Sequence, residues 1–364
     1  MKQKESLAVR LKKWPLLLPV VCLLLVMAVN IIHDAATGVN PFSFFMITVQ
    51  HTTGNGNILY GRIIDILNRG SEAAILALGM TLVVSASAGT DISVGSVMSL
   101  SASMCCMLLA GFGVTSVSTD LKMPIFVGVL AGLAIGMLCG AFNGFLVAYL
   151  KIQPMVATLI LYSAARAIGL LLCNNMIVYV RNDAYAFFGS FLGPIPTPII
   201  ITIICIVILS LVLKKTALEM YVQSVGINAK ASRIAGLNST VIIFLAYLLC
   251  GLFAGIAGIV SSSRITSADS NNIGLYMEMD AILAVALGGN SLGGGKFNLA
   301  GSVIGAYTIQ AITTTLYALG VSTDQAPVFK AIIVILIVAI QAPPVKTWMK
   351  KRQSKRVEVK EAVA

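Results

Sequence analysis

Charged side chains are scarce in this chain. Only 11% of its 364 residues are Asp, Glu, Lys or Arg, and 58% are hydrophobic, whereas soluble domains average about 25% charged and about 45–50% apolar residues. A soluble protein of this size needs a charged surface, and too little charge is present here to cover one. The composition excludes an ordinary soluble domain and indicates that the outer surface faces membrane lipid.

Groups that carry out catalysis or bind metals are also few. The two histidines, His33 and His51, lie in one segment without a plausible nucleophile. The seven cysteines lie in or beside apolar runs, with neither metal-ligand spacing nor the framework of a secreted disulfide scaffold. We interpret them as small hydrophobic side chains packed between helices. The chain is predicted not to be an enzyme and to hold neither a metal nor a cofactor.

A phosphate-binding loop is absent as well. The run from Gly293 to Lys296 superficially resembles one, but Asn290 stands where that motif needs its first glycine and Phe297 where it needs Ser or Thr. We therefore predict that the glycine run is an irregular turn and that this chain binds no ATP.

Long apolar runs make up most of the chain. A membrane-crossing helix needs about 20 residues, and ten candidate segments are present, of which the eighth is too short to cross alone. They are residues 15–32, 66–88, 93–113, 124–150, 153–173, 197–213, 241–262, 280–292, 298–319 and 327–342. The predicted fold is all-α, a polytopic membrane helix bundle of about ten transmembrane segments, some short or discontinuous. We interpret the first segment as a retained helix because no small-residue cleavage site follows it, with a cleaved signal as the alternative.

The net charge of +11 is concentrated at the two ends. Basic residues crowd segments 1–14 and 343–364, which flank a membrane domain over 15–342. Basic clusters beside apolar spans set membrane orientation and do not require a nucleic-acid partner. The positive-inside rule predicts that both termini and the basic segment 214–240 are cytoplasmic, and that segments such as 174–196 and 263–279 lie outside.

Glycine recurs at every fourth position of the fourth segment. The stripe consists of Gly128, Gly132, Gly136, Gly140 and Gly144. Such a stripe lets a second helix approach closely, and a smooth pore-lining face is the alternative interpretation. A weaker pattern is the word Ala-Ile-Leu-Ala at 74–77 and again at 281–284, each followed by Gly-Ser-Val. It indicates either two related halves, as in many transporters, or a chance recurrence.

A few polar side chains interrupt the apolar segments. Such groups are costly in lipid and are expected to face the interior of the bundle, where they either line a substrate pathway or form interhelical hydrogen bonds. They are Asn68, Asp91, Asn143, Thr158 and Arg166. Asp91 lies in a turn at 89–95, where it and Ser93 are well placed to cap the following helix.

The segment 214–240 is the longest one predicted to be cytoplasmic. Asn228 suits a helix N-cap and Gly236 a helix stop, with about two turns of small residues between them. So short a helix is marginal alone in water. It is therefore expected to pack either on its own bundle or into a cytoplasmic partner.

These stretches carry a resemblance to a known family. Asp65–Arg69, Leu78–Val83 and Gly89–Gly95 resemble the signature of ribose/xylose/galactose-type ABC permeases, Val225–Leu237 resembles their coupling loop, and Asp280–Gly295 resembles their late glycine motif. The match runs in the family order from about residue 60 to 341. Within the family, Lys151–Pro154, Ala157–Ile160, Lys215–Leu218 and Ala268–Asn272 most resemble galactofuranose-type permeases. Thr90, where the family usually has Ile, and a longer segment between Gly38 and Gly61 depart from the pattern.

The resemblance implies the permease subunit of an ATP-binding-cassette importer. It would move a monosaccharide, galactofuranose or a related pentose or hexose, across the bacterial inner membrane. Its implied partners are an ABC ATPase that uses the ATP, a second permease copy or a related permease, a periplasmic sugar-binding protein and membrane lipid, with no nucleic acid. The residues implied in ATPase coupling are Gly226, Asn228, Ala231, Arg233 and Gly236. Among the pathway candidates, Asn143 and Arg166 are preferred because amide and guanidinium donors match sugar hydroxyls.

Two other classes of membrane protein fit the sequence less well. An ion-coupled secondary sugar transporter would more naturally show coupling carboxylates at mid-membrane and would not need the projection within 214–240. A membrane-embedded enzyme is disfavoured because no catalytic constellation is present.

Overall fold

The computed structural model describes residues 16–38, 40, 42–52, 56–113 and 117–341. The predictions for the basic ends, 1–14 and 343–364, lie outside the described residues. The chain divides into two compact units, Met1–Ala311 and Ile312–Ala364. In the second, the last turns of α13 and helix α14 are joined by a turn at Gly320, whose φ is 80°.

Helices dominate both units, so the all-α prediction is confirmed. Each of the ten predicted segments contains a helix. These are α2 (Leu17–Ala36), α3 (Arg62–Ser87), α4 (Val94–Ala110), α5 (Ile125–Gly144), α6 (Pro154–Leu172), α8 (Thr197–Lys215), α11 (Ser239–Ile265), α12 (Met277–Leu287), α13 (Leu299–Ala318) and α14 (Ala326–Gln341). Shorter helical elements are η1 (Ser43–Phe45), η2 (Phe145–Tyr149), α7 (Asp183–Ala186), α9 (Leu218–Ile227) and α10 (Ala229–Ile234).

The strands are short and form three two-stranded antiparallel ribbons. They pair β1 (Thr48–Thr52) with β2 (Gly56–Tyr60), β3 (Val178–Tyr179) with β6 (Ser267–Ala268), and β4 (Phe191–Leu192) with β5 (Ile195–Pro196). In the longest ribbon Thr48 pairs with Tyr60 and Gln50 with Ile58. None of the three ribbons closes into a barrel, so the helices carry the fold.

Six helices in the described part of the chain are long and apolar enough to cross a membrane. They are Pro19–Ala36, Arg62–Ser87, Ile125–Tyr149, Pro154–Leu172, Thr197–Lys215 and Ser239–Ile265. Helix α4, with 17 residues, is shorter, and α12, with 11, is too short to cross alone, in agreement with the expectation of short segments. The figure of ten crossings therefore stays a prediction, whereas six helices have the length and composition that a crossing needs.

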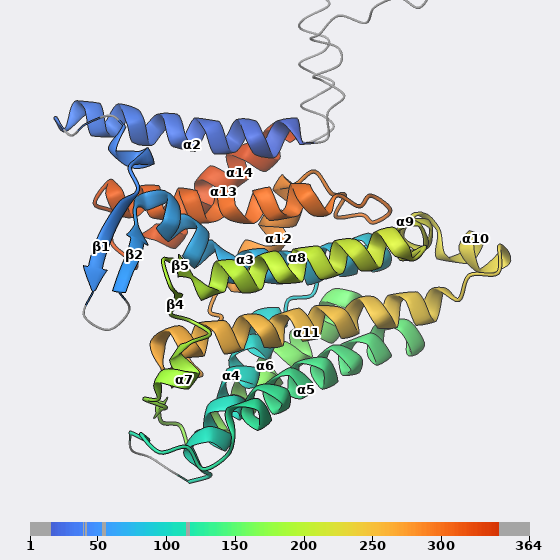
Figure 1. Ribbon diagram of the computed structural model, residues 1–364. Helices are drawn as coiled ribbons and strands as arrows, with labels where there is room; N and C mark the ends of the chain where they lie inside the picture. The colour runs from blue at the N-terminus through green and yellow to red at the C-terminus, as the bar shows by residue number, and fades with distance from the viewer. Residues whose placement is uncertain (1–15, 39, 41, 53–55, 114–116, 342–364) are drawn as a thin grey trace, which may run out of the picture. The chain divides into compact units, whose positions relative to one another are not determined.

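Helix α3 lies at the centre of the first unit, beside α8, α11 and α12 (Figure 1). Every residue from Gly70 to Ala86 is buried. A helix that is apolar all round and enclosed by other helices has no lipid-facing side. A polar group on α3 therefore needs a partner within the protein, either on the same helix, as for Ser71 with the carbonyl oxygen of Leu67, or on a neighbouring element.

The glycine stripe of α5 packs against α11 and α4, as the close-packing interpretation predicts. A Cβ added at Gly136 would lie 2.5 Å from the carbonyl oxygen of Gly251, and one added at Gly140 would overlap the carbonyl oxygen of Tyr247. At Gly132 the added atom would lie 2.9 Å from the carbonyl oxygen of Ser101 on α4. The stripe is thus an interhelical contact surface.

All seven cysteines are buried with free thiols, which confirms their role as small packing residues. Cys250, for example, fills the space beside Gly79, where α3 and α11 cross. Because every native thiol is buried, an engineered surface cysteine will react with thiol reagents in preference to the native ones.

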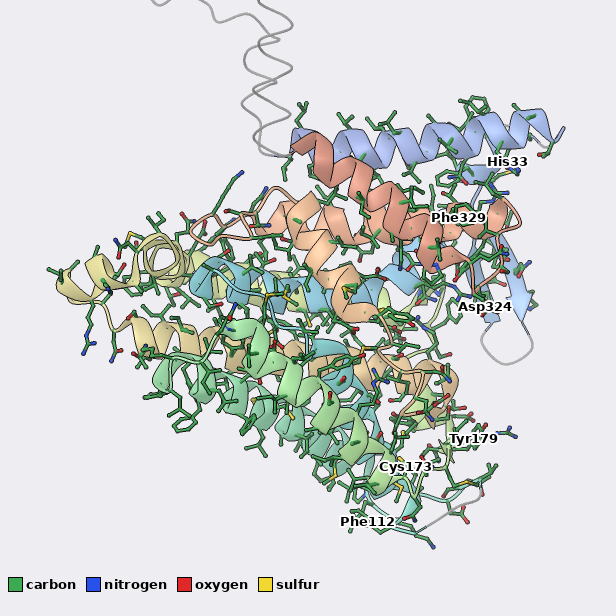
Figure 2. All side chains as sticks on the ribbon, turned by 180° about the vertical axis from the view of Figure 1, so that it is seen from behind. His33, Phe112, Cys173, Tyr179, Asp324 and Phe329 are labelled. Carbon is green, nitrogen blue, oxygen red and sulfur yellow. The ribbon has the colours of Figure 1, made fainter. Side chains whose placement is uncertain are left out.

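The two ends of the first unit differ in structure. Figure 1 shows α9 and α10 at one end and α7, the β1–β2 ribbon, β4 and β5 at the other. Figure 2 places Phe112, Cys173 and Tyr179 together, where α4 and α6 end beside β3. Segments 174–196 and 263–279 therefore share one side of the bundle, opposite 214–240, as the predicted alternation requires. The related-halves hypothesis stays a prediction.

The packing of α5 on α11 makes a stability prediction. Gly140→Ala should cost about 1–3 kcal/mol, because its Cβ would overlap the backbone of Tyr247 and neither helix can move away freely. The measurement is the thermal unfolding midpoint of the detergent-solubilised protein. Leu138→Ala on the same helix is the control, since Leu138 is 64% exposed and should barely shift the midpoint. An unchanged midpoint for Gly140→Ala would contradict the tight packing described here.

Candidate functional site

Three of the five predicted pathway residues gather at the turn between α3 and α4. Asp91 is 2% exposed, and its Oδ1 accepts the backbone N–H of Ser93 at 2.9 Å and the hydroxyl of Ser93 at 2.6 Å. Asn143 of α5 donates from Nδ2 to Ser93 Oγ at 2.9 Å and to Asp91 Oδ1 at 3.4 Å. Thr158 of α6 accepts the N–H of Ile92 at 3.2 Å. Two helices, α5 and α6, thus hold the turn between α3 and α4.

The capping prediction is wrong for both side chains, because α4 has no side-chain capping hydrogen bond among the described residues and Asp91 accepts the N–H of Ser93, the residue before the helix. Ser93 occupies the N-cap position of α4 but its side chain makes no capping hydrogen bond. Its hydroxyl donates to Asp91 instead, since the carboxylate is a stronger acceptor than a hydroxyl. Asp91 therefore fixes the backbone immediately before the helix. Among the residues that the structure describes, buried Asn143 Oδ1 has no hydrogen-bond partner.

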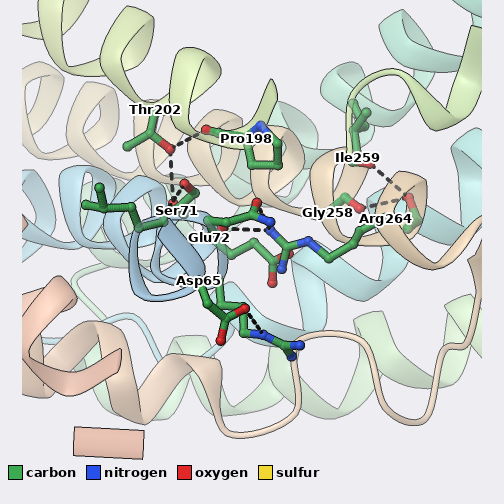
Figure 3. A network of polar contacts seen from close by, with 12 residues as sticks. Asp65, Ser71, Glu72, Pro198, Thr202, Gly258, Ile259 and Arg264 are labelled. Atoms are coloured by element: carbon green, nitrogen blue, oxygen red, sulfur yellow. Dashed lines mark hydrogen bonds and ion pairs between the residues drawn. The ribbon is translucent and has the colours of Figure 1, made fainter. Parts of the chain in front are cut away.

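Asn68 lies apart from this turn, nearer the beginning of α3. The guanidinium of Arg264, on α11, donates from Nη2 to the Asn68 backbone oxygen at 2.8 Å and to Asn68 Oδ1 at 3.3 Å. Arg264 Nη1 also lies 2.9 Å from Glu72 Oε1 (Figure 3). The sequence reasoning did not select Glu72 or Arg264. Glu72 falls inside the predicted segment 66–88, so the rule that selected Asn68 applies to it as well.

Arg166, on α6, lies in a third place. Its Nη1 donates to the carbonyl oxygens of Ser270 and Asn271, each at 2.8 Å, and of Ile273 at 3.3 Å. Its Nε and Nη2 are buried and have no hydrogen-bond partner within the described part of the chain. Arg166 therefore fastens segment 270–273 to α6 and retains donors that are unused in this structure.

Segment 270–273 is also fastened to α4. Ser99 donates its hydroxyl to the Ser270 carbonyl oxygen at 3.0 Å, and the hydroxyls of Ser103 and Ser270 lie 2.7 Å apart. Glu278, 2% exposed at the beginning of α12, packs its carboxylate against Gly95 of α4. The sequence reasoning did not select Glu278 either, because that reasoning considered polar groups in the predicted membrane spans and the segment of Glu278 was predicted to lie outside them.

The predicted coupling helix is present as α10. Asn228 Oδ1 accepts the N–H groups of Lys230 at 3.1 Å and Ala231 at 3.0 Å, and Gly236 ends the turn with φ 88°. Both capping predictions are confirmed. Ala231 and Arg233 are exposed, whereas Ser232 is buried.

The most exposed apolar residue of α10 was not selected from the sequence. Ile234 is 90% exposed and Ile227, just before the helix, is 75% exposed. Exposed isoleucines on a short helix project an apolar surface away from the bundle. The sequence pattern alone did not show which face of so short a helix is free.

Gly226 connects α9 to the interior. A Cβ added there would overlap the carbonyl oxygen of Ser85 and lie 2.6 Å from the backbone nitrogen of Gly295. Gly295 N–H donates to the Ser85 carbonyl oxygen at 3.1 Å, and Ser85 Oγ donates to the Lys296 carbonyl oxygen at 2.9 Å. Gly294 and Gly295 have positive φ values of 83° and 75°, which confirms the irregular turn. The end of α3, the end of α9 and the glycine turn are one packed joint.

The role of Asp91 can be tested by two substitutions. Asp91→Asn keeps an acceptor oxygen for the Ser93 N–H and should fold normally, whereas Asp91→Leu removes the acceptor and should cost roughly 0.5–2 kcal/mol. Thermal unfolding and membrane abundance are the measurements. Asp120→Leu, at an exposed aspartate, is the control and should behave like wild type. Equal damage from Asn and Leu at position 91 would show that the charge, and not the acceptor, holds the turn.

Comparison with known proteins identifies the family. The family model described as "Branched-chain amino acid transport system / permease component" matches residues 62–340. The galactofuranose transporter permease protein YtfT of Escherichia coli (strain K12) is 42% identical over 333 residues, which is 91% of each chain. No solved structure matches the chain significantly.

Two further relatives agree with this family. The fructose import permease protein FruF of Bifidobacterium longum (strain NCC 2705) is 34% identical over 88% of each chain. The ribose import permease protein RbsC of Escherichia coli (strain K12) is 34% identical over 81% of this chain and 90% of its own. The predicted resemblance to ribose-type and galactofuranose-type permeases is thereby confirmed. With its several membrane-spanning helices, the chain belongs to this family and is a multi-pass permease component of an ABC transporter.

Proposed function

We propose that this chain is the permease subunit of an importer that carries a monosaccharide, galactofuranose or a related pentose or hexose, across the bacterial inner membrane. The observation that carries the proposal is the 42% identity with the galactofuranose permease over 91% of both chains. Fructose and ribose import permeases among the relatives support the same substrate class. Buried polar groups from α3, α4, α6 and α12 supply hydrogen-bonding capacity inside the bundle.

The energy source is a separate ATPase that docks on α10. A 90% exposed isoleucine, Ile234, projects from this helix beside exposed small residues such as Ala231 and Ala235. Exposed apolar side chains rimmed by polar ones are typical of protein–protein contact sites. Asn228 and Gly236 fix both ends of the helix, which makes it a rigid element to insert into a socket.

Movement of α10 is transmitted through Gly226. Because Gly226 touches Ser85 at the end of α3 and Gly295 in the glycine turn, a displacement of α9 and α10 moves both. The turn at 88–93 follows directly on α3, and Asp91, Asn143 and Thr158 hold it to two further helices. Docking on the ATPase is in this way linked to the polar interior.

The orientation follows from the charges. The basic residues Lys214 and Lys215 end α8 on the side that carries α10, so the positive-inside rule places this side in the cytoplasm together with both termini. The opposite side, with β1–β2, α7 and segment 263–279, then receives sugar from a periplasmic binding protein. A second permease copy, identical or related, completes the transporter.

An ion-coupled carrier is less well supported. The buried carboxylate of Asp91, in the turn between α3 and α4, is committed to a structural contact with the backbone of Ser93. A coupling carboxylate must instead exchange its proton or ion in each cycle. Such a carrier also has no use for the projecting apolar surface of α10.

Docking can be tested by overfilling the contact. Ala231→Trp should abolish co-purification of the ATPase, because a bulky ring on the exposed face of α10 cannot enter a socket shaped for a small residue. Ala184→Trp is the matched control, since α7 is another short helix with an asparagine N-cap but lies at the opposite end of the bundle. Unchanged co-purification and uptake with Ala231→Trp would rule out α10 as the docking element.

Transport itself is tested in proteoliposomes containing the permease, its ATPase and its binding protein. Labelled monosaccharides should accumulate with ATP and without a proton gradient, for the wild type and equally for Asp91→Asn, which keeps the acceptor oxygen. Accumulation that requires the gradient and is lost in Asp91→Asn would instead establish an ion-coupled carrier.

A further inference from the structure

A cavity opens beside the ion pair of α3 and α11. It has a volume of about 270 Å³, and its lining includes Glu72, Ser261, Asn272 and Leu275 together with apolar Ile265 and Met277. Ligand pockets span roughly 300–1,000 Å³, so this one suits a molecule of a single small ring. Polar groups on one wall and apolar side chains on another match the two kinds of surface that a sugar ring presents.

Glu72 lines the cavity, and its ion pair with the neighbouring Arg264 has hydrogen-bonding capacity to spare. Glu72 is 8% exposed, and Arg264 Nη1 lies 2.9 Å from Glu72 Oε1 (Figure 3). The two groups are close but not aligned as a hydrogen bond, and neither Glu72 Oε1 nor Arg264 Nε has a hydrogen-bond partner among the described residues. The Ser261 hydroxyl lies within reach of the same carboxylate.

Stability does not account for such a pair. Removing two charges from water costs about as much as their attraction returns, so apolar residues of similar volume would serve an interhelical contact as well or better. A carboxylate in a cavity wall with a guanidinium beside it does, however, suit the recognition of hydroxyl groups, since the first accepts and the second donates hydrogen bonds. The position of the pair fits its use by a ligand.

The location also fits. Glu72 lies in the first half of α3, and Arg264 is the penultimate residue of α11. Segment 272–277 comes shortly after the end of α11. This is the side of the bundle opposite α10, and therefore the side on which a delivered sugar would enter under the proposed function.

We propose that the Glu72–Arg264 pair and the cavity beside it form the entry subsite of the permease. There, the hydroxyl groups of one monosaccharide leave the binding protein and form hydrogen bonds with Glu72 and Arg264. The proposal rests on the proposed function and specifies where the sugar is first held. Glu72 accepts sugar hydroxyls, Arg264 donates to sugar oxygens, and Leu275 contacts the apolar face of the ring.

Two single substitutions test the polar wall. Glu72→Gln and Arg264→Gln should each lower ATP-driven uptake in proteoliposomes about tenfold or more, because each removes a charged hydrogen-bonding partner of the sugar. Membrane abundance and thermal unfolding are measured alongside. Asp65→Asn is the matched control: it breaks the exposed 2.7 Å Asp65–Arg69 ion pair on the same helix, outside the cavity lining, and should leave uptake unchanged.

A charge reversal separates ligand binding from helix packing. The double variant Glu72→Arg with Arg264→Glu restores an ion pair between α3 and α11 but exchanges donor and acceptor in the cavity. Restored abundance with uptake still reduced about tenfold or more is expected. Full recovery of uptake would show that the pair only joins two helices, and would overturn the proposal.

Thiol protection tests occupancy without depending on the folding of the charge variants. Leu275→Cys places a thiol in the lining at a residue that is 39% exposed, while all native cysteines are buried. A polar maleimide should label it in the purified complex, and the imported monosaccharide at millimolar concentration should slow labelling. Leu192→Cys, at a 52% exposed residue of β4 outside this cavity, should be labelled at the same rate with and without sugar.

Absence of labelling at position 275, or labelling that the imported sugar does not slow, overturns the entry subsite even if monosaccharide import by the wild type is normal. If the wild-type complex imports no monosaccharide at all, the proposed function fails and the subsite fails with it. The two failures are thus distinguished by the wild-type uptake measurement.

Discussion

The burial of α3 is the constraint on which the arrangement of polar groups depends. From Gly70 to Ala86 every residue of this helix is buried, so its polar side chains need partners within the protein. Glu72 finds Arg264 on α11, Thr81 donates to Ser302 on α13 at 2.7 Å, and Ser85 donates to the glycine turn. One central helix is in this way tied to several others by single polar contacts.

Glycine makes the enclosure of α3 possible. Lipid tails are as apolar as leucine, so helices in a membrane gain little from apolar burial and associate through close contact instead. Gly136 and Gly140 bring α5 against the backbone of α11, and Gly79 lets α11 approach α3 at Cys250. Helix α11 therefore contacts the glycine stripe of α5 on one side and forms the ion pair with α3 on the other.

The two ends of the bundle have different chemistry for a related reason. At the end with α10, backbone contacts at Gly226, Ser85 and Gly295 join three segments without side chains between them, which makes a stiff mechanical link. At the opposite end, Arg166 and Arg264 reach across to carbonyl oxygens and leave buried donors unused. A stiff joint suits the transmission of movement, and unused donors suit a ligand that arrives and leaves.

Features encoded by neighbouring residues were determined by the sequence itself. The apolar segments, the caps at Asn228 and Gly236, the glycine stripe and the irregular glycine turn all depend on residues within a few positions of one another. Other features depended on how the helices pack. Packing brings Asp91, Asn143 and Thr158 together and keeps Asn68 and Arg166 away from them. It also turns Ile234 outward. Asn68 and Arg264 are 196 positions apart, and local periodicity carries no information about such a pair. Only the tertiary structure decided these contacts, because the partner of a buried polar group is chosen by which helices pack together and in which register.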